Sequence, residues 1–220
     1  MEKNREAIRM MQEKKYEEAA KLFNEIIEEN PSDPLGYINF GNLLVELQEN
    51  ERAERFFLKA IDLDENAATA YYGLGNLYFE QNQFEHAAKY LQHALDKGLE
   101  DAHVYYLLGL SLQNKEEFRL ALPYLLRATE LQPGETNYLF QYGLSLAQCQ
   151  LIDEAKSVFT KVIDFDKEHS DAYYNLGVIA VFEEDAKQAL AYFDTALQNQ
   201  SDHYLAANGK KQVEEFLENL

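Results

Sequence analysis

The chain is 220 residues long and 46% hydrophobic, and its 39 acidic against 20 basic residues give a formal net charge of −19 at pH 7. So large an acidic excess disfavours binding to nucleic-acid backbones and to anionic membranes, and it leaves a basic or apolar partner as the easier expectation. The four prolines and ten glycines are too few for a turn-rich β-sandwich or for disordered linkers.

Cysteine content and hydropathy bear on the compartment. Cys149 is the only cysteine, so the chain cannot form an internal disulfide, and this fits a reducing environment. The N-terminal stretch has no apolar core of signal-peptide length, and no later stretch approaches the roughly eighteen apolar residues of a membrane span. We therefore expect a cytoplasmic protein.

Small and apolar residues recur along the chain at a constant spacing of 34 residues. The repeated glycines are Gly41, Gly75, Gly109, Gly143 and Gly177. The repeated alanines are Ala19, Ala53, Ala87, Ala121, Ala155 and Ala189. A third series is Phe23, Phe57, Leu91, Leu125, Phe159 and Phe193. A period of this length is typical of a helical repeat protein.

In chain order, the spacing predicts six helix-turn-helix units and a last helix. The unit boundaries are 1–33, 34–67, 68–101, 102–135, 136–169 and 170–203, with a capping helix over 204–220. Glycine inside a helix costs about 0.5–1 kcal/mol relative to alanine, so the repeated glycines need a compensating contact. We expect Ala53 and Ala87 to meet them from the second helix of each pair, with Phe57 and Leu91 filling the space between the helices.

The two ends of the chain depart from the repeat. Unit 1–33 has Lys3 and Glu6 where the next unit has Tyr37 and Phe40, which suits a first helix with no earlier neighbour. The last helix has five apolar residues that we expect to pack on the preceding unit. These residues are Leu205, Val213, Phe216, Leu217 and Leu220.

Two interior positions also depart from the repeat. Unit 68–101 ends in Gly98-Leu99 where a proline is usual, and glycine is itself an adequate helix stop. Pro123 falls well inside the second helix of unit 102–135, where it removes the hydrogen bond to the carbonyl of Arg119. A kink on the outer face is predicted there.

The repeat resembles the tetratricopeptide (TPR) signature W-x₂-L-G-x₂-Y…A-x₃-F…P. In unit 68–101 the matching residues are Tyr71, Leu74, Gly75, Tyr78, Ala87 and Leu91. Stretches such as "AATAYYGLGN" and "LALPYL" further resemble the short, stand-alone YrrB-type TPR proteins of Gram-positive bacteria. The resemblance implies an all-α fold: a right-handed superhelical α-solenoid of six 34-residue TPR units plus a C-terminal capping helix, forming one solenoid over 1–220.

The resemblance also implies a binding site on the concave face, which the first helices line. With the repeated glycine as the eighth residue of a unit, ligands of the family usually meet the second, fifth, sixth, ninth, twelfth and thirteenth residues. We call these the groove-facing positions. The predicted peptide-binding residues are Ile38, Asn39, Asn42, Tyr72, Asn76, Phe79, Tyr106, Leu110, Phe140, Leu144, Tyr174 and Val178.

The groove-facing positions are poor in charge. Across the last five units only Glu46, Glu80 and Asp171 are charged among them, although 27% of the whole chain is charged. None is Lys or Arg, whereas six are aromatic. A partner that covers this face would explain the pattern. The alternative is that the large residues only pack against adjacent first helices.

No constellation for catalysis, metal or cofactor binding emerges from the sequence. The five histidines are scattered, and the paired glutamates are typical of solvated faces in so acidic a chain. The calcium-loop-like start at Asp62 and Asp64 lacks the required glycine and glutamate. We expect neither enzymatic activity nor a metal or cofactor.

These observations predict a non-enzymatic adaptor that binds an extended peptide segment of a partner protein, uncharged, apolar or basic, without contact to nucleic acid or membrane. Two alternatives stay open: a self-assembling structural protein that forms homo-oligomers, and an accessory subunit of an RNA-modifying enzyme. A clamp for a C-terminal carboxylate is disfavoured, because Ile38, Tyr72 and Tyr106 stand where the leading lysine would fall in such family members.

Overall fold

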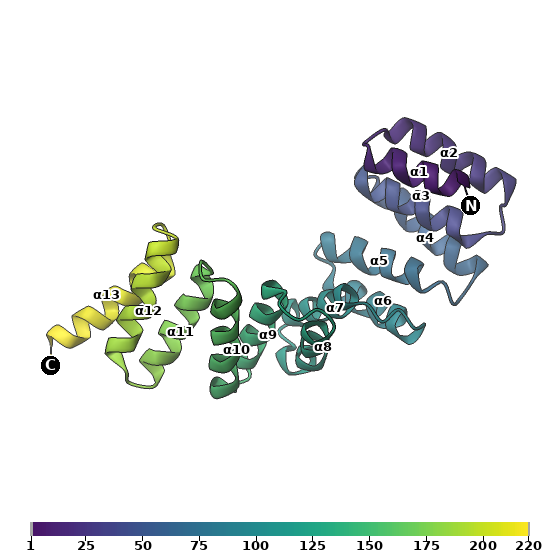
Figure 1. Ribbon diagram of the computed structural model, residues 1–220. Coiled ribbons are helices and arrows are strands. Elements are labelled where there is room, and N and C mark those ends of the chain that lie inside the picture. Colours follow the sequence, from purple (N-terminus) through teal and green to yellow (C-terminus); the bar gives the residue numbers. More distant parts are fainter. Residues whose placement is uncertain (1, 220) are drawn as a thin grey trace. The chain divides into compact units, whose positions relative to one another are not determined.

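The structure is a computed structural model that describes residues 2–219, and within this range the chain forms thirteen α-helices and no strand (Figure 1). The first seven helices are α1 (Glu2–Gln12), α2 (Tyr16–Glu29), α3 (Pro34–Glu46), α4 (Asn50–Leu63), α5 (Ala68–Glu80), α6 (Phe84–Asp96) and α7 (Ala102–Asn114). The other six are α8 (Phe118–Leu131), α9 (Thr136–Gln148), α10 (Ile152–Phe165), α11 (Ser170–Phe182), α12 (Ala186–Asn199) and α13 (Tyr204–Glu218).

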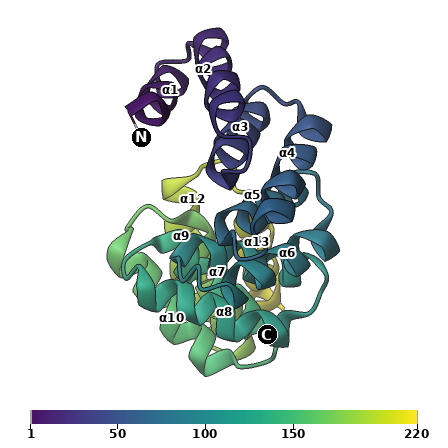
Figure 2. The same ribbon diagram turned by 90° about the vertical axis from the view of Figure 1, so that its right-hand side faces the viewer.

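The predicted all-α helical repeat with a capping helix is confirmed, since consecutive helices pair into hairpins that stack on one another (Figures 1 and 2). The helices group into two compact units, each of which contains several of the 34-residue repeats. The first unit is Met1–Glu116 and the second unit is Glu117–Leu220, so the division falls between α7 and α8. Within the first unit, α1–α2, α3–α4 and α5–α6 are hairpins; within the second, α9–α10 and α11–α12 are. The single solenoid over 1–220 and its handedness stay predictions.

Each first helix ends in the same backbone motif. A residue with positive φ follows it, at positions that again lie 34 apart: Lys14, Gln48, Asn82, Glu116, Gln150 and Glu184. After α5, the Asn82 N–H donates to the carbonyl of Phe79 and the Gln83 N–H to that of Tyr78, both at 2.9 Å. This pair of bonds satisfies carbonyls that the helix end would otherwise leave unpaired.

In the hairpins α3–α4, α5–α6, α9–α10 and α11–α12, a glycine of the first helix meets a large apolar side chain of the second. A Cβ added at Gly41 would lie 2.7 Å from the Phe57 ring, and one added at Gly73 would lie 2.5 Å from the same ring. The close approach is therefore possible only for glycine. The prediction that Ala53 meets the glycine is therefore corrected, because the atoms nearest to these glycines belong to Phe57 and not to Ala53.

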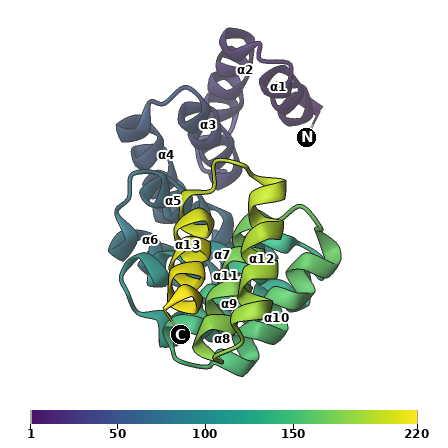
Figure 3. The ribbon, with the colours of Figure 1, turned by 90° about the vertical axis from the view of Figure 1, so that its left-hand side faces the viewer.

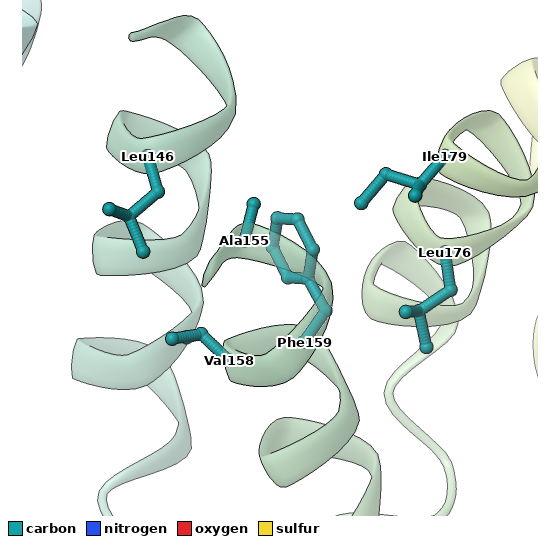
Figure 4. Close-up of a cluster of buried hydrophobic side chains, with 6 residues drawn as sticks. All are labelled: Leu146, Ala155, Val158, Phe159, Leu176 and Ile179. Carbon is teal, nitrogen blue, oxygen red and sulfur yellow. The ribbon is translucent and has the colours of Figure 1, made fainter. Parts of the chain in front are cut away.

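The same arrangement holds in the second unit. Phe159 of α10 is fully buried between α9 and α11, where it forms a cluster with Leu146, Leu176 and Ile179 (Figure 4). Its ring would lie 2.7 Å from a Cβ at Gly143. Because each ring packs against two helices at once, a hairpin completes its core only with its neighbour.

The capping helix differs from its prediction. Only Ala206 and Val213 of α13 are buried, so the expectation that Leu205, Phe216 and Leu217 pack on the preceding unit is wrong. Residue 220, also predicted to pack there, lies outside the described residues. Leu205 and Phe216 lie on a different face of α13 from Ala206 and Val213. Leu217 shares the face of Val213 but lies one turn further on, close to the end of the helix.

The two interior departures have different outcomes. Gly98 has φ +90°, and the N–H groups of Gly98 and Leu99 donate to Leu95 and Ala94, so glycine does stop α6. The helix α8 continues through Pro123, whose side chain is exposed, while the kink stays a prediction.

Candidate peptide-binding site

In the first unit, the predicted site residues near the N-terminus are not equally accessible. Ile38 is only 6% exposed and packs with Ala60, Ala67 and Ala70, which gives it a core role. Asn42, by contrast, is exposed. The half-buried Asn39 has a partner inside the chain: its Nδ2 donates to Oδ1 of Asn4 at 3.2 Å.

A histidine lies between the two predicted tyrosines of this unit. The ring centroid of His103 is 6.4 Å from that of Tyr72 and 6.0 Å from that of Tyr106. Farther along α5, the Phe79 ring packs edge-on against Phe84 at 5.7 Å. Three of the predicted site residues of α5 and α7 are thus in ring contacts and half-buried. The other two, Asn76 and Leu110, are also half-buried.

In the second unit, the aromatic residue at the fifth position of each first helix contacts two rings. Phe140 lies 5.7 Å from Phe159 of its own hairpin and 4.6 Å from His169. One repeat later, Tyr174 lies 6.0 Å from Phe193 and 5.4 Å from His203. Packing therefore accounts for part of the surface of these side chains, as the alternative interpretation required.

These histidines have a structural role that the sequence reading missed. Nδ1 of His203 accepts the N–H of Ala206 and so caps α13, while its Nε2 lies 3.1 Å from Oδ1 of Asp171. His169 caps α11 by accepting the N–H of Ala172. The available signal was the 34-residue spacing of His169 and His203, which gives both histidines the same position in the repeat.

The second unit also holds an apolar hollow of about 800 Å³ between α11, α12 and α13, which we call the C-terminal pocket. The ribbons of these three helices are seen in Figure 3. Its apolar lining is formed mainly by Tyr174, Val178, Val181, Phe193, Leu205 and Phe216. The predicted site residues Tyr174 and Val178 therefore meet here, whereas Leu144 is half-buried in the α9–α11 cluster.

Exposure of apolar side chains distinguishes this pocket from the rest of the predicted site. Val178 is 43% exposed, Val181 45%, Leu205 51% and Phe216 63%, and the neighbouring Phe182 reaches 71%. Four of these five residues were not among the predicted binding residues. They occupy the second, twelfth and thirteenth positions of the repeat, so the position rule itself could have found them.

Other chemistry finds little support in the described residues. No group of three or more His, Cys, Asp or Glu side chains among them is arranged to hold a metal ion. No helix within residues 2–219 is long and apolar enough to cross a membrane. The candidate residues are thus half-buried aromatic side chains and amides in the first unit, and half-buried aromatic side chains and an apolar pocket in the second.

A stack of helix hairpins with a repeat of 34 residues defines the class of helical repeat proteins, and comparison gives the family. Residues 41–82 match the TPR repeat family, and residues 68–98, 102–135 and 170–203 match the tetratricopeptide repeat family. The chain belongs to the tetratricopeptide repeat family. This fold is typical of scaffolds for protein–protein interaction.

YrrB proteins are among the similar relatives, as the resemblance implied. The TPR repeat-containing protein YrrB of Bacillus subtilis (strain 168) is 54% identical over 41 residues, which cover 19% of this chain and only a fifth of that protein. A solved structure of YrrB, described as a TPR protein with an unusual peptide-binding site, has 44% identity and a TM-score of 0.84, and covers 87% of this chain and 99% of that one. Similarity to PilF of Pseudomonas aeruginosa, at 16% identity and a TM-score of 0.78 over 96% of both chains, shows the fold alone.

Proposed function

We propose that the protein is a non-enzymatic, cytoplasmic scaffold that binds a peptide segment of a partner protein on the groove-facing side of its first helices. One observation carries this proposal: apolar side chains at groove-facing positions of α11 and α13 are exposed, whereas Leu176 and Ile179 of α11 are buried. Exposed apolar groups that gather at one site are typical of an interaction surface. The peptide-binding site described for YrrB supports the same role for this chain.

The chemistry of the groove-facing positions suggests how such a segment would be held. Asn42 and Asn76 offer amide groups that can both donate to and accept from a peptide backbone. Tyr72 and Tyr106 offer flat aromatic surface with a polar hydroxyl. With a net charge of −19, the protein would repel an acidic segment and attract a basic one, while an uncharged one remains acceptable.

The proposal is tested by comparing the partners that wild type and a groove variant recover from a lysate of the source organism. The variant is Tyr72→Ala/Tyr106→Ala/Phe140→Ala, and the matched control is Phe165→Ala, whose ring is 63% exposed on α10 away from these positions. Circular dichroism first establishes that all three proteins are folded. A partner recovered by wild type and control but lost by the variant supports the proposal. Equal recovery on all three baits places the binding elsewhere and contradicts it.

Self-assembly is the second candidate, because α13 also exposes Tyr204 and Leu217 beside Leu205 and Phe216. A second copy of the chain could cover these side chains in place of another protein. Light scattering over a range of concentrations separates the two functions. A constant monomer mass excludes self-assembly, whereas a mass that rises with concentration and falls in Phe216→Ser favours it.

A further inference from the structure

The part of the C-terminal pocket that α13 lines combines polar and small residues with the apolar Leu205 and Phe216. Asn208, Gly209 and Gln212 contribute to the lining from this helix. Gly209 lets the ring of Phe193 approach, since a Cβ there would lie 2.8 Å from that ring. The capping helix therefore closes the core around Phe193 while leaving Val178 and Val181 uncovered.

The size of this pocket suits side chains of a partner. Its volume of about 800 Å³ lies within the range of about 300–1,000 Å³ that is usual for ligand sites. The walls come from Tyr174, Val178, Val181, Leu205 and Phe216, which can contact an inserted apolar group from both α11 and α13. A bulky aliphatic or aromatic side chain would therefore lose its hydration on entering and be held by dispersion contacts.

The charge around the pocket indicates what should accompany the apolar group. Glu184 is the one charged residue among those that line it, and it forms no ion pair with the described residues. The surrounding segment, 170–219, has nine acidic residues against three lysines. Each of the two lysines of α13 is already paired with an acid: Lys210 lies 2.7 Å from Asp194 and Lys211 lies 3.5 Å from Glu215.

These pairs occupy two of the three lysines of the segment, while the third, Lys187, is exposed on α12. Asp194 raises the pKa of Lys210 by hydrogen bonding to its ammonium group, so this lysine stays charged and engaged. Glu183, next to Glu184, is likewise occupied by Lys156 at 2.6 Å. The negative charge that is left for a ligand is therefore that of Glu184 at the pocket, beside an acidic surface.

We infer that the C-terminal pocket binds a bulky apolar side chain of a partner protein segment that has a lysine or arginine next to it. The apolar group fills the hollow between α11 and α13, and the cation lies against Glu184. This inference rests on the proposed function and assigns to it a place in the chain and a chemistry of ligand. A segment with an acidic neighbour would be repelled, because Glu184 is of like charge.

The test uses the full chain and a displayed library of random peptides. Selection on the wild-type protein should enrich peptides in which Leu, Ile, Phe or Trp stands beside Lys or Arg. The affinity of an enriched, fluorescently labelled peptide is then measured by anisotropy. Val178→Asn/Val181→Asn should weaken it by about tenfold or more. Glu184→Gln should weaken it by several-fold at low salt and have little effect at high salt, because added ions screen the charge pair.

Matched controls come from the same unit. Leu126→Asn changes an apolar residue of α8 that is 39% exposed, and Glu154→Gln removes an exposed acid of α10. Neither residue lines the pocket, so neither change should alter the affinity. All four variants alter exposed positions, and their folding is checked by circular dichroism.

Three outcomes would overturn the inference. Enriched peptides that bind equally well to Val178→Asn/Val181→Asn would leave peptide binding as the function but remove it from this pocket. A library without any enriched peptide would count against both the pocket and the proposed function. A wild-type dimer that Val181→Asn converts to a monomer would show that the occupant is a second copy of this chain.

Discussion

The α5–α6 hairpin of the first unit and the α11–α12 hairpin of the second have the same contact in their interior. In α5, Gly75 meets Leu91 of α6, and a Cβ there would lie 2.6 Å from Cγ of that leucine. In α11, Gly177 meets Phe193 of α12, where a Cβ would lie 2.5 Å from the ring. Both large side chains are almost fully buried, so this contact forms part of the core of each unit.

The same two hairpins differ at the groove-facing positions. Asn76 and Phe79 of α5 are half-buried, and the Phe79 ring has Phe84 beside it. The equivalent residues of α11 are Val178 and Val181, which are apolar and exposed, and Phe182 follows them. Packing between helices fixes the residue type in the interior, whereas at the groove-facing positions the residue type is free to suit a ligand. An apolar residue kept there without a covering neighbour therefore indicates binding.

The largest effect should come from removing the buried ring that defines the shared interior. Phe193→Ala is expected to lower the free energy of unfolding by about 3–5 kcal/mol, as truncation of a buried phenylalanine usually does. Phe57→Ala should cost a similar amount, because that ring too contacts two glycines. Urea unfolding followed by circular dichroism measures both. Phe182→Ala is the control and should change stability by less than about 0.5 kcal/mol.

A clear inequality between Phe57→Ala and Phe193→Ala would show that the interiors of the two units are not equivalent. A large loss in Phe182→Ala would show that its ring contributes to packing and not to an interaction surface.

The next effect concerns the glycines themselves. Gly177→Ala places a methyl group against the Phe193 ring, so it should destabilise by about 1–3 kcal/mol despite the better helix propensity of alanine. Gly75→Ala should do the same in the first unit. Gly36→Ala is the graded control, since its Cβ would lie 3.1 Å from the movable Cγ1 atom of Ile27. Thermal unfolding ranks the three, and a loss in Gly36→Ala as large as in Gly177→Ala would contradict the role given to the ring.

A smaller effect is expected where the two units share a backbone conformation. Gln48 and Gln150 have φ of 59° and 62° at the ends of α3 and α9. Glycine adopts this region without strain, so Gln48→Gly and Gln150→Gly should each raise stability by about 0.5–1 kcal/mol. Gly98→Ala, at φ +90°, should have the opposite sign. Destabilisation by both Gln→Gly changes would mean that their side chains contribute more than the backbone costs.

The smallest effect is a pH dependence of stability that Tyr78 gives to the α5–α6 hairpin and that the α11–α12 hairpin should lack. Burial, and then the hydrogen bond that its hydroxyl donates to Glu54 at 2.7 Å, raise the pKa of Tyr78 above its usual range, while Ala180 stands at this place in α11. Above about pH 10 the unfolded chain loses this tyrosine proton and the folded chain keeps it. The folded state then binds more protons, so its stability falls as the pH rises.

Urea unfolding at neutral pH and above pH 10 measures this decline, which should be smaller in Tyr78→Phe than in wild type. The same decline in both proteins would assign the pH dependence to other tyrosines, such as the half-buried Tyr142, whose pKa is also raised by desolvation.

The sequence predicted most of what packing dictates. The repeat of Gly41, Ala53 and Phe57 located the hairpins and their close contacts, because only small residues allow two helices to approach and only a large one fills the gap beside them. The sequence did not predict the residues with positive φ that follow the first helices. These residues are Lys, Gln, Asn and Glu, whereas glycine is the residue that usually marks such a conformation. There, two backbone hydrogen bonds decide the conformation whatever the side chain is.

The candidate site was harder to predict than the fold. Position in the repeat correctly drew attention to Tyr174 and Val178, which line the C-terminal pocket, but it also included Ile38, which is buried by alanines of the α4–α5 region. Accessibility depends on the neighbouring helix, and a periodic pattern does not give it. For the same reason the exposed Leu205 and Phe216 were taken for packing residues.

One feature of the core bears on how such a chain can change its length. The ring of Phe57 meets Gly41 of its own hairpin and Gly73 of the next helix, and Phe193 meets Gly177 and Gly209 in the same way. Within a hairpin, the ring follows its glycine by 16 residues, as Phe57 follows Gly41 and Phe193 follows Gly177. Duplication or loss of one complete hairpin keeps this spacing, whereas an insertion of another size inside a hairpin would change it. Gene duplication can therefore lengthen or shorten this architecture only in whole repeats.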